Sequence, residues 1–311
     1  MTNEHKGWRS LRDALRKATA AFSAFALTAC ATAPADPVPA AATAEAPRPA
    51  LWKLSDADTD IYLFGTIHIL PAGFEWRTPA IDAALAESDE LVLETVLGDD
   101  PAKSAQAMMA KGMSPNNPPI LDRVPADRRA ALQQLMTSTG VPAAALDRMD
   151  TWAAALILFT TQFQKMGLTG KSGVETALQG AAGTKPVSGL ETIEQQFGFF
   201  DNLSEESQRL FLVATIDDSI DVREQFEKMI AAWASGDTDA IAATFDAPAS
   251  MSPEFREVLM TRRNAAWAEW IAKRMERPGT VMVAVGAGHL AGRDSVQAML
   301  AAKGLRVERV Q

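Results

Sequence analysis

Two of the three histidines in the chain follow a glycine at the same spacing. Gly65 precedes His68 at the end of one apolar run, Gly286 precedes His289 at the end of another far downstream, and His5 lies near the amino terminus. Imidazole nitrogen is a common ligand of divalent metals, and glycine lets backbone approach a ligand closely. Two such histidines and a carboxylate would hold a divalent metal, which makes bound water a usable nucleophile near neutral pH. A histidine taken alone is more commonly a half-buried structural residue, so the prediction depends on both histidines sharing one site.

Short β-prone runs would position these side chains. Four such runs end on a histidine or an acid: 61–67 before His68, 91–93 before Glu94, 281–285 ahead of His289, and 185–190 before Glu191. In open α/β sheets, ligands bind beyond the carboxyl ends of the strands, where loops from distant sequence positions meet. The sequence therefore predicts that both histidines and Glu94 lie at one sheet edge. Glu94 by itself is a weak candidate, because many strands end on a solvated acid.

The composition, with 47% hydrophobic and 22% charged residues among 311, is typical of a globular protein with one sizeable core. Residues 51–54 and 61–67 predict a β-hairpin, because a cluster of turn residues separates them. From about 101 to 280 the chain is mostly helical, with helix starts indicated by Ser204 and Ser252. A strand, a helix and a strand end the chain. This order predicts an α/β fold, with α+β as the other possibility, in which a central mixed β-sheet carries a large helical insertion.

The amino-terminal segment has the features of a secretory signal. Residues 1–29 combine basic residues with an apolar run that is too short to span a bilayer comfortably. Residues 27–30, Leu-Thr-Ala-Cys, resemble the lipobox of bacterial lipoproteins, so we expect Cys30 to be lipidated; the alternative is a core thiol. Residues 30–50 are rich in Ala and Pro and predict an extended tether, which leaves 51–311 as the folded domain.

The lipobox resemblance implies a lipid-anchored protein of the bacterial cell envelope. Ala31 stands where the sorting pattern uses Asp for retention at the inner membrane, which favours the outer membrane, facing the periplasm. Cys30 is the only cysteine, so the chain can form no internal disulfide. The net charge is −9, and residues 1–29 hold five basic against two acidic side chains, so the remainder is more acidic still. This balance argues against nucleic-acid binding, which needs a basic surface.

Six short segments, spread over the expected domain, carry the most specific pattern in the sequence. They are Leu63–Pro71, Glu90–Glu94, Gly173–Glu175, Gly189–Thr192, Arg263–Asn264 and Val285–Leu290. Their residues and order resemble the TraB/GumN/PrgY family, which includes the Tiki proteases that cleave Wnt ligands. The resemblance implies a fold like those of Tiki, erythromycin-esterase and ChaN-like proteins, and a metal-dependent peptidase built on two Gly-x-x-His motifs and a glutamate. One departure is Glu175, where an aspartate is expected in many relatives; the negative charge is kept.

The resemblance also implies roles for the matching residues. His68 and His289 would bind a divalent metal ion, with Mn, Co and Zn as candidates. Glu94 would be the third ligand or the general base, since either role needs a carboxylate close to bound water. Arg263 and Asn264 would hold a substrate carbonyl or carboxylate, or else lie on a solvated helix face.

Two other side chains have weaker predicted roles. Glu191 is a candidate for supporting the metal ligands or the bound substrate. Trp267 lies at helical spacing with apolar residues, which favours core packing over stacking on a substrate.

Three functions are compatible with these patterns. The first is a membrane-tethered, metal-dependent hydrolase that acts on a peptide or protein in the cell envelope. The second is a non-catalytic envelope lipoprotein that sequesters a ligand or binds haem or metal, since related ChaN-like lipoproteins bind haem. The third is a structural or interaction role. The sequence indicates neither the substrate nor the oligomeric state.

Overall fold

A computed structural model describes residues 46–96, 101–219, 221–246 and 252–311. The predicted signal peptide, Cys30 and most of the predicted tether lie outside these ranges. The last tether residues are packed against the domain, because Ala50 is buried and the backbone N–H of Arg48 donates to the carbonyl of Ala234 at 2.6 Å. The packed domain therefore includes residues ahead of Leu51.

A mixed β-sheet forms the centre of the molecule. Its strands are β1 Leu51–Ser55, β2 Thr59–Thr66, β3 Glu90–Leu93, β4 Val187–Gly189, β5 Gly279–Gly286 and β6 Glu308–Arg309. Within the described ranges their order is β4-β3-β5-β2-β1-β6. Strands β2, β5, β3 and β4 run parallel, whereas β1 is antiparallel to both β2 and β6. The predicted hairpin and mixed sheet are confirmed, and the terminal strand is shorter than the sequence indicates.

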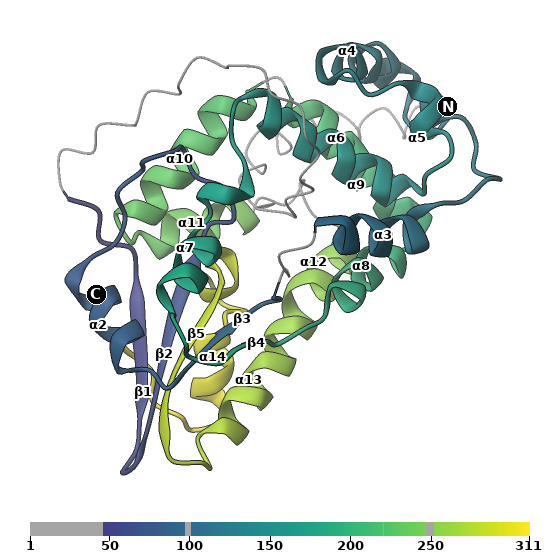
Figure 1. The fold of residues 1–311 in the computed structure, drawn as a ribbon. Helices are drawn as coiled ribbons and strands as arrows, with labels where there is room; N and C mark the ends of the chain where they lie inside the picture. Colours follow the sequence, from purple (N-terminus) through teal and green to yellow (C-terminus); the bar gives the residue numbers. More distant parts are fainter. Residues whose placement is uncertain (1–45, 97–100, 220, 247–251) are drawn as a thin grey trace.

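Helices surround the sheet and extend beyond it (Figure 1). Their bounds are α2 Pro79–Glu87, α3 Pro101–Gly112, α4 Arg129–Thr139, α5 Ala143–Leu146, α6 Thr151–Lys165, α7 Val174–Ala181, α8 Ile193–Asp201, α9 Glu205–Asp218, α10 Val222–Ala234, α11 Thr238–Asp246, α12 Pro253–Arg256, α13 Arg262–Arg274 and α14 Val296–Ala302. Ser204 and Ser252 cap α9 and α12 as predicted, each accepting a backbone N–H with its hydroxyl. The described residues between β3 and β5 are thus mostly helical apart from β4 and short irregular segments.

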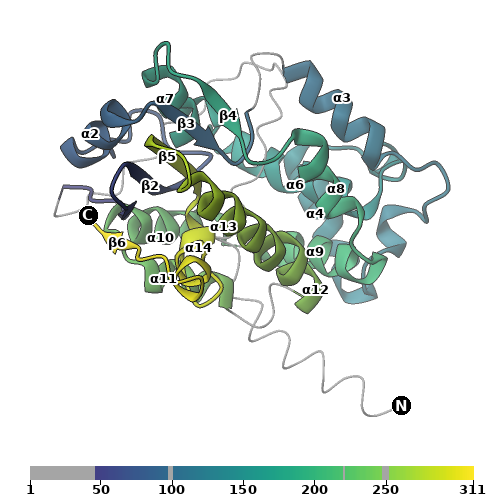
Figure 2. The same cartoon turned by 90° about the horizontal axis from the view of Figure 1, so that it is seen from below.

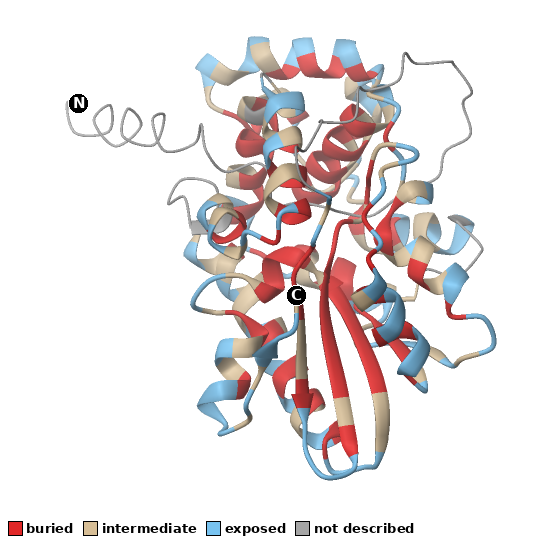
Figure 3. Cartoon of the chain, turned by 90° about the vertical axis from the view of Figure 1, so that its left-hand side faces the viewer, coloured by how far each residue is buried: buried red, intermediate tan, exposed pale blue. Residues whose placement is uncertain are grey.

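Alternate side chains of the strands pack on opposite faces of the sheet, as the two-residue period of a strand requires. Ile61, Leu63, Val281 and Val283 contact α13 and α14, where Trp267, Ile271, Val296 and Leu300 complete a buried cluster. Phe64, Met282 and Ala284 face α2, and their cluster continues into the helical region. Figure 2 shows the helices on either side of the sheet from below, and Figure 3 shows buried residues along the strands and on the inward sides of the helices.

Apart from α13, which packs on the sheet, most of the helical region lies beyond the carboxyl ends of the parallel strands. In Figure 1, β2 and β5 rise from the β1–β2 turn towards α10, α6 and α9. A hydrogen bond joins the two parts, because the indole N–H of Trp233 in α10 donates to the carbonyl of Gly65 in β2 at 2.8 Å. Across the described part of the chain, no helix combines the length and hydrophobicity needed to cross a membrane.

Candidate functional site

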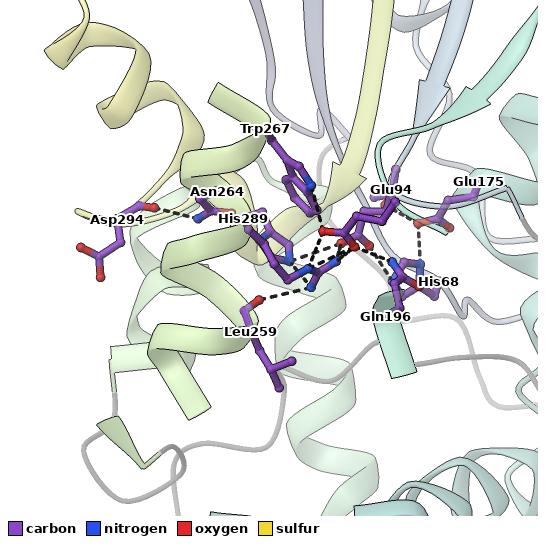
Figure 4. Close-up of polar contacts among 12 residues, drawn as sticks. His68, Glu94, Glu175, Gln196, Leu259, Asn264, Trp267, His289 and Asp294 are labelled. Atoms are coloured by element: carbon purple, nitrogen blue, oxygen red, sulfur yellow. Dashed lines mark hydrogen bonds and ion pairs between the residues drawn. The ribbon is translucent and has the colours of Figure 1, made fainter. Parts of the chain in front are cut away.

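The carboxyl ends of four parallel strands meet in one place, as predicted. Thr66 at the end of β2 is paired with Gly286 at the end of β5, so the loops carrying His68 and His289 leave the sheet side by side. Strands β3 and β4 end beside β5 and carry Glu94 and Glu191. Figure 4 shows His68, Glu94 and His289 converging from these separate elements.

His68 lies between two carboxylates. Its Nδ1 is 2.6 Å from Oε1 of Glu175, and its Nε2 is 3.4 Å from Oε2 of Glu94. The hydroxyl of Thr66 also donates to Glu175. Burial by itself lowers the pKa of His68, but Glu175 and Glu94 outweigh that effect and raise the pKa to about 10. With 28% of its side chain exposed, His68 is the most accessible member of the group.

His289 is buried and held in one orientation. Its Nδ1 lies 2.5 Å from Oδ1 of Asn264, and the amide nitrogen of Asn264 donates to the carbonyl of Asp294 at 2.7 Å. Because that donation fixes which end of the amide is oxygen, Nδ1 of His289 must carry the proton. Burial, together with the cation of Arg263, lowers the pKa of His289 to about 3. The ring is therefore neutral. Its Nε2, which carries a lone pair, lies 3.3 Å from Oε1 of Glu94.

Arg263 connects Glu94 and Glu191 to His289. One terminal nitrogen, Nη2, donates to Glu94 at 2.7 Å and to Glu191 at 2.8 Å. The other, Nη1, donates to the carbonyl of Leu259 at 3.2 Å and lies 3.3 Å from Nε2 of His289. Burial raises the pKa of Glu94, but Arg263 and the histidines outweigh this and hold the pKa well below its ordinary value. Glu94 is therefore a carboxylate at any physiological pH.

The two motif glycines serve different purposes. A Cβ added at Gly65 would lie 3.1 Å from Cα of Ala287, so the turn that carries His289 can approach β2 only because Gly65 has no side chain. A Cβ at Gly286 would lie 3.5 Å or more from its neighbours, which is ordinary contact distance. The close approach that the motif predicts is thus required at Gly65 and not at Gly286.

A π-helical turn, Glu257–Thr261, precedes Arg263 and Asn264 on α13. Such turns occur often at functional sites because they shift the following side chains relative to a regular helix. Both residues point into the site rather than to solvent, and Asn264 is 1% exposed. The alternative of a solvated helix face is therefore wrong for this pair. In the structure Asn264 contacts His289 and Arg263 contacts acids, so neither lies free for a substrate.

The donor atoms can be compared with the needs of a divalent metal ion. Two ligand atoms bound to one tetrahedral ion at 2.0–2.1 Å lie about 3.4 Å apart. Nε2 of His68 lies 3.4 Å from Oε2 of Glu94 and Nε2 of His289 lies 3.3 Å from Oε1, so each imidazole is about this distance from one oxygen of the carboxylate. With both imidazoles neutral, the carboxylates of Glu94, Glu175 and Glu191 together with the cation of Arg263 would leave two negative charges for the ion to balance. The chemistry of these donors therefore fits a divalent ion.

The arrangement as it stands does not enclose an ion. No group of three or more His, Cys, Asp or Glu side chains within the described ranges is arranged to hold a metal. The cation of Arg263 already contacts Glu94 and His289. His68, Glu94 and His289 are the residues that could bind a metal, provided that Arg263 gives up part of its contacts.

The sequence assigned no role to Glu175, whose carboxylate contacts His68 in the structure. The segment that carries Glu175 is packed on the His68 loop: the backbone N–H of Val174 donates to Ile67 at 3.0 Å. A Cβ at Gly173 would collide with the carbonyl of His68, at 2.1 Å. Gly173–Glu175 is among the segments that resemble the family, but nothing local in it shows that the partner of Glu175 lies more than 100 residues earlier.

Two other predicted residues support the site from behind. Glu191 accepts two hydrogen bonds from Nε of Arg263, at 2.9 and 3.2 Å. Trp267 is buried in the core as predicted, but its indole N–H also donates to Glu191 at 2.9 Å and its ring lies 4.5 Å from that of His289. Trp267 is therefore both a core residue and a wall of the site.

Comparison with known proteins gives the same relationship as the motifs. The family model of the TraB/PrgY/gumN family matches residues 50–309. Uncharacterized protein YbaP of Escherichia coli (strain K12) is 27% identical over 252 residues, which cover 77% of this chain and 87% of that protein. An uncharacterized protein of Treponema pallidum (strain Nichols) is 24% identical over 264 residues, covering 79% and 78% of the two chains.

No solved structure matches the chain, so the expected likeness to Tiki, erythromycin-esterase and ChaN-like folds stays a prediction. The family relationship does not depend on it. Since the family match covers most of the sequence and includes every residue of the site, the chain belongs to the TraB/PrgY/gumN family.

Proposed function

We propose that this protein is a metal-dependent hydrolase that cleaves a peptide or protein substrate. His68 and His289 would hold a divalent ion, Mn, Co or Zn, together with Glu94. One observation carries the proposal: both Nε2 atoms face the carboxylate of Glu94, while both Nδ1 atoms are occupied, by Glu175 and Asn264. Histidines that bind metals commonly use one ring nitrogen for the ion and the other for a carboxylate or carbonyl oxygen.

The ion, when bound, would polarise a substrate carbonyl and lower the pKa of a water molecule. The protein's own groups perform the other tasks. Glu175 orients His68, and Asn264 keeps the Nε2 lone pair of His289 turned into the site. Glu94 would be a ligand, or would take a proton from water as the general base, since its carboxylate lies between the two imidazoles.

The exposed side of the site indicates how a substrate would enter. The side chains of Glu94, Glu191 and His289 are 7–8% exposed, whereas His68 is 28% and Glu175 18% exposed. A substrate would therefore approach from the His68 side. Its scissile carbonyl would meet His68 before the buried members of the group.

We also propose a cell-envelope location. Lipidation at Cys30 would anchor the chain, and the residue after it favours the outer membrane with the domain facing the periplasm. The support is the signal-like segment and the lipobox of the sequence. A Cys30→Ala chain should lose incorporation of radioactive palmitate; a chain that still incorporates it would contradict the anchor.

The metal content of purified protein tests the hydrolase proposal. Wild type should hold one divalent ion per chain, and His68→Ala and His289→Ala should each lose it. Glu94→Gln should abolish cleavage of a mixed peptide library, as read by mass spectrometry. Glu90→Gln is a matched control, because Glu90 is at the opposite end of the same strand, where it bonds Arg274.

Two outcomes would reject the proposal in different ways. A metal-free wild type that still cleaves peptides would exclude the ion. A protein that binds metal or peptide but leaves every peptide intact would favour the sequestering function, and a strong visible absorption band on adding haem would favour a haem binder.

A further inference from the structure

Two hydrogen-bond acceptors face each other inside the site. His289 carries its proton on Nδ1, where Asn264 accepts it, so its Nε2 presents a lone pair. Oε1 of Glu94 lies 3.3 Å from that nitrogen. Neither atom has a proton to offer the other, and burial removes water that could separate them. A donor or a cation must therefore satisfy both atoms at once.

Arg263 supplies that cation. Its Nη1 lies within hydrogen-bond distance of Nε2 of His289, at 3.3 Å, and its Nη2 donates to Oε1 of Glu94 at 2.7 Å. The planar guanidinium thus contributes one N–H to each acceptor. A neutral imidazole nitrogen has a single lone pair in the ring plane. The hydrogen bond from Arg263 and a bond from His289 to a metal ion consequently exclude each other.

We propose that Arg263 is an internal counter-cation of the metal-free site and competes directly with the divalent ion for Nε2 of His289 and Oε1 of Glu94. The inference rests on the proposed function, in which these two atoms are metal ligands. It adds a regulatory property: the ion binds only when Arg263 withdraws, so metal occupancy and the position of this side chain are coupled.

The surroundings of Arg263 allow such a withdrawal. Its Nε is held by both oxygens of Glu191, and Nη1 also donates to the carbonyl of Leu259. The guanidinium lies 4.8 Å from the ring of Trp267 and 5.4 Å from that of Phe199. If Nη1 and Nη2 turn away from His289 and Glu94, both carboxylate oxygens of Glu191 still face the guanidinium, so a withdrawn Arg263 remains paired. The apparent metal affinity then equals the intrinsic affinity multiplied by the fraction of molecules in which Arg263 has withdrawn.

Metal titration of full-length variants tests the competition. The main variant combines Arg263→Met with Glu191→Gln, which removes one positive and one negative charge and leaves the net charge of the site unchanged. Co²⁺ binding would be followed by visible absorption, and Zn²⁺ binding by calorimetry. The double variant should bind Co²⁺ at least about tenfold more tightly than wild type. A factor of this size corresponds to the energy of one competing hydrogen bond to a charged group.

A second variant protects the test against misfolding. Arg263→Lys keeps the charge but loses the planar fork, and the three N–H donors of one ammonium cannot replace the contacts of Arg263 with Leu259, Glu191, Glu94 and His289 together, so its hold on the two acceptors is weaker. It should also bind Co²⁺ more tightly than wild type. The matched control combines Arg274→Met with Glu90→Gln. This arginine–glutamate pair also has a largely buried arginine, but it lies at the other end of the sheet, and its loss should leave Co²⁺ affinity unchanged.

Each result decides the inference separately from the proposed function. If wild type binds Co²⁺ and neither Arg263 variant binds it more tightly, the competition is refuted and the metal-dependent function stands. If only the Arg263 variants bind Co²⁺, the competition is supported and the ion is not a cofactor of the wild-type protein. If no variant binds Co²⁺ or Zn²⁺, both ideas fail.

Discussion

Replacing Glu175 by Gln should weaken metal binding without touching a metal ligand. The Nδ1–H of His68 donates to Oε1 of Glu175 at 2.6 Å, the length of a charge-assisted hydrogen bond. Mutation of a residue that hydrogen-bonds a metal-binding histidine commonly lowers the metal affinity by about 10–100-fold. Glutamine keeps an acceptor oxygen but loses the charge, and both side chains are partly exposed, so we expect about a tenfold loss. Alanine removes the acceptor as well, and the expected loss is about 100-fold.

A chelator-competition titration with Zn²⁺ would measure both variants against wild type. Glu87→Gln is the matched control, because Glu87 accepts a hydrogen bond of the same length, 2.6 Å, from Tyr62 outside the site. The control should keep wild-type affinity. A Glu175→Gln protein that is folded and binds Zn²⁺ as tightly as wild type would refute the conclusion that this carboxylate orients His68.

Three further predictions concern the protein without metal. Asn264→Ala should lower the free energy of unfolding by about 1–3 kcal/mol in urea titrations, because it leaves the buried Nδ1–H of His289 unpaired. Gly65→Ala should lower it by about 1–3 kcal/mol through crowding against Ala287. The stabilisation contributed by His68 should be complete below its unfolded pKa of 6.5 and lost as pH rises towards the folded value of about 10, as measured by chemical unfolding at several pH values after chelation.

Controls separate these effects from general damage. Gly180→Ala places a methyl group in open space on α7, so it should be neutral or slightly stabilising. An Asn264→Ala protein as stable as wild type would mean that the imidazole has another acceptor. An equally stable Gly65→Ala protein would show that the turn at Ala287 can move away. A His68→Gln variant with the same pH profile as wild type would contradict the assignment of that titration to His68.

Much of the sheet and the convergence of its strand ends could be predicted from local patterns. Apolar runs of strand length, each ending on a histidine or an acid, placed His68, Glu94, His289 and Glu191 at the carboxyl edge before any tertiary contact was known. Local chemistry determines where a strand ends, and parallel pairing then brings the ends together. The terminal strand was overestimated, because the run 305–310 has β-prone residues but only Glu308–Arg309 pair with β1.

The tertiary structure alone decided which side chain meets which. Arg263 and Glu94 are separated by 169 positions, and Glu175 lies 109 positions after Thr66, its hydrogen-bond donor beside His68. The direction of Arg263 depends on how α13 packs through Trp267 and Ile271 on the sheet, and no local period encodes that packing.

The sequence by itself therefore determined which residue types stand at the ends of the strands, since strand length and turn residues are properties of neighbouring positions. The tertiary structure decided the protonation and partners of those residues. It made His289 neutral through burial and Arg263, fixed its tautomer through Asn264, surrounded His68 with two carboxylates, and placed Arg263 between two acceptors. Burial and the charges within a few ångströms set these properties, and both exist only after distant segments have packed together.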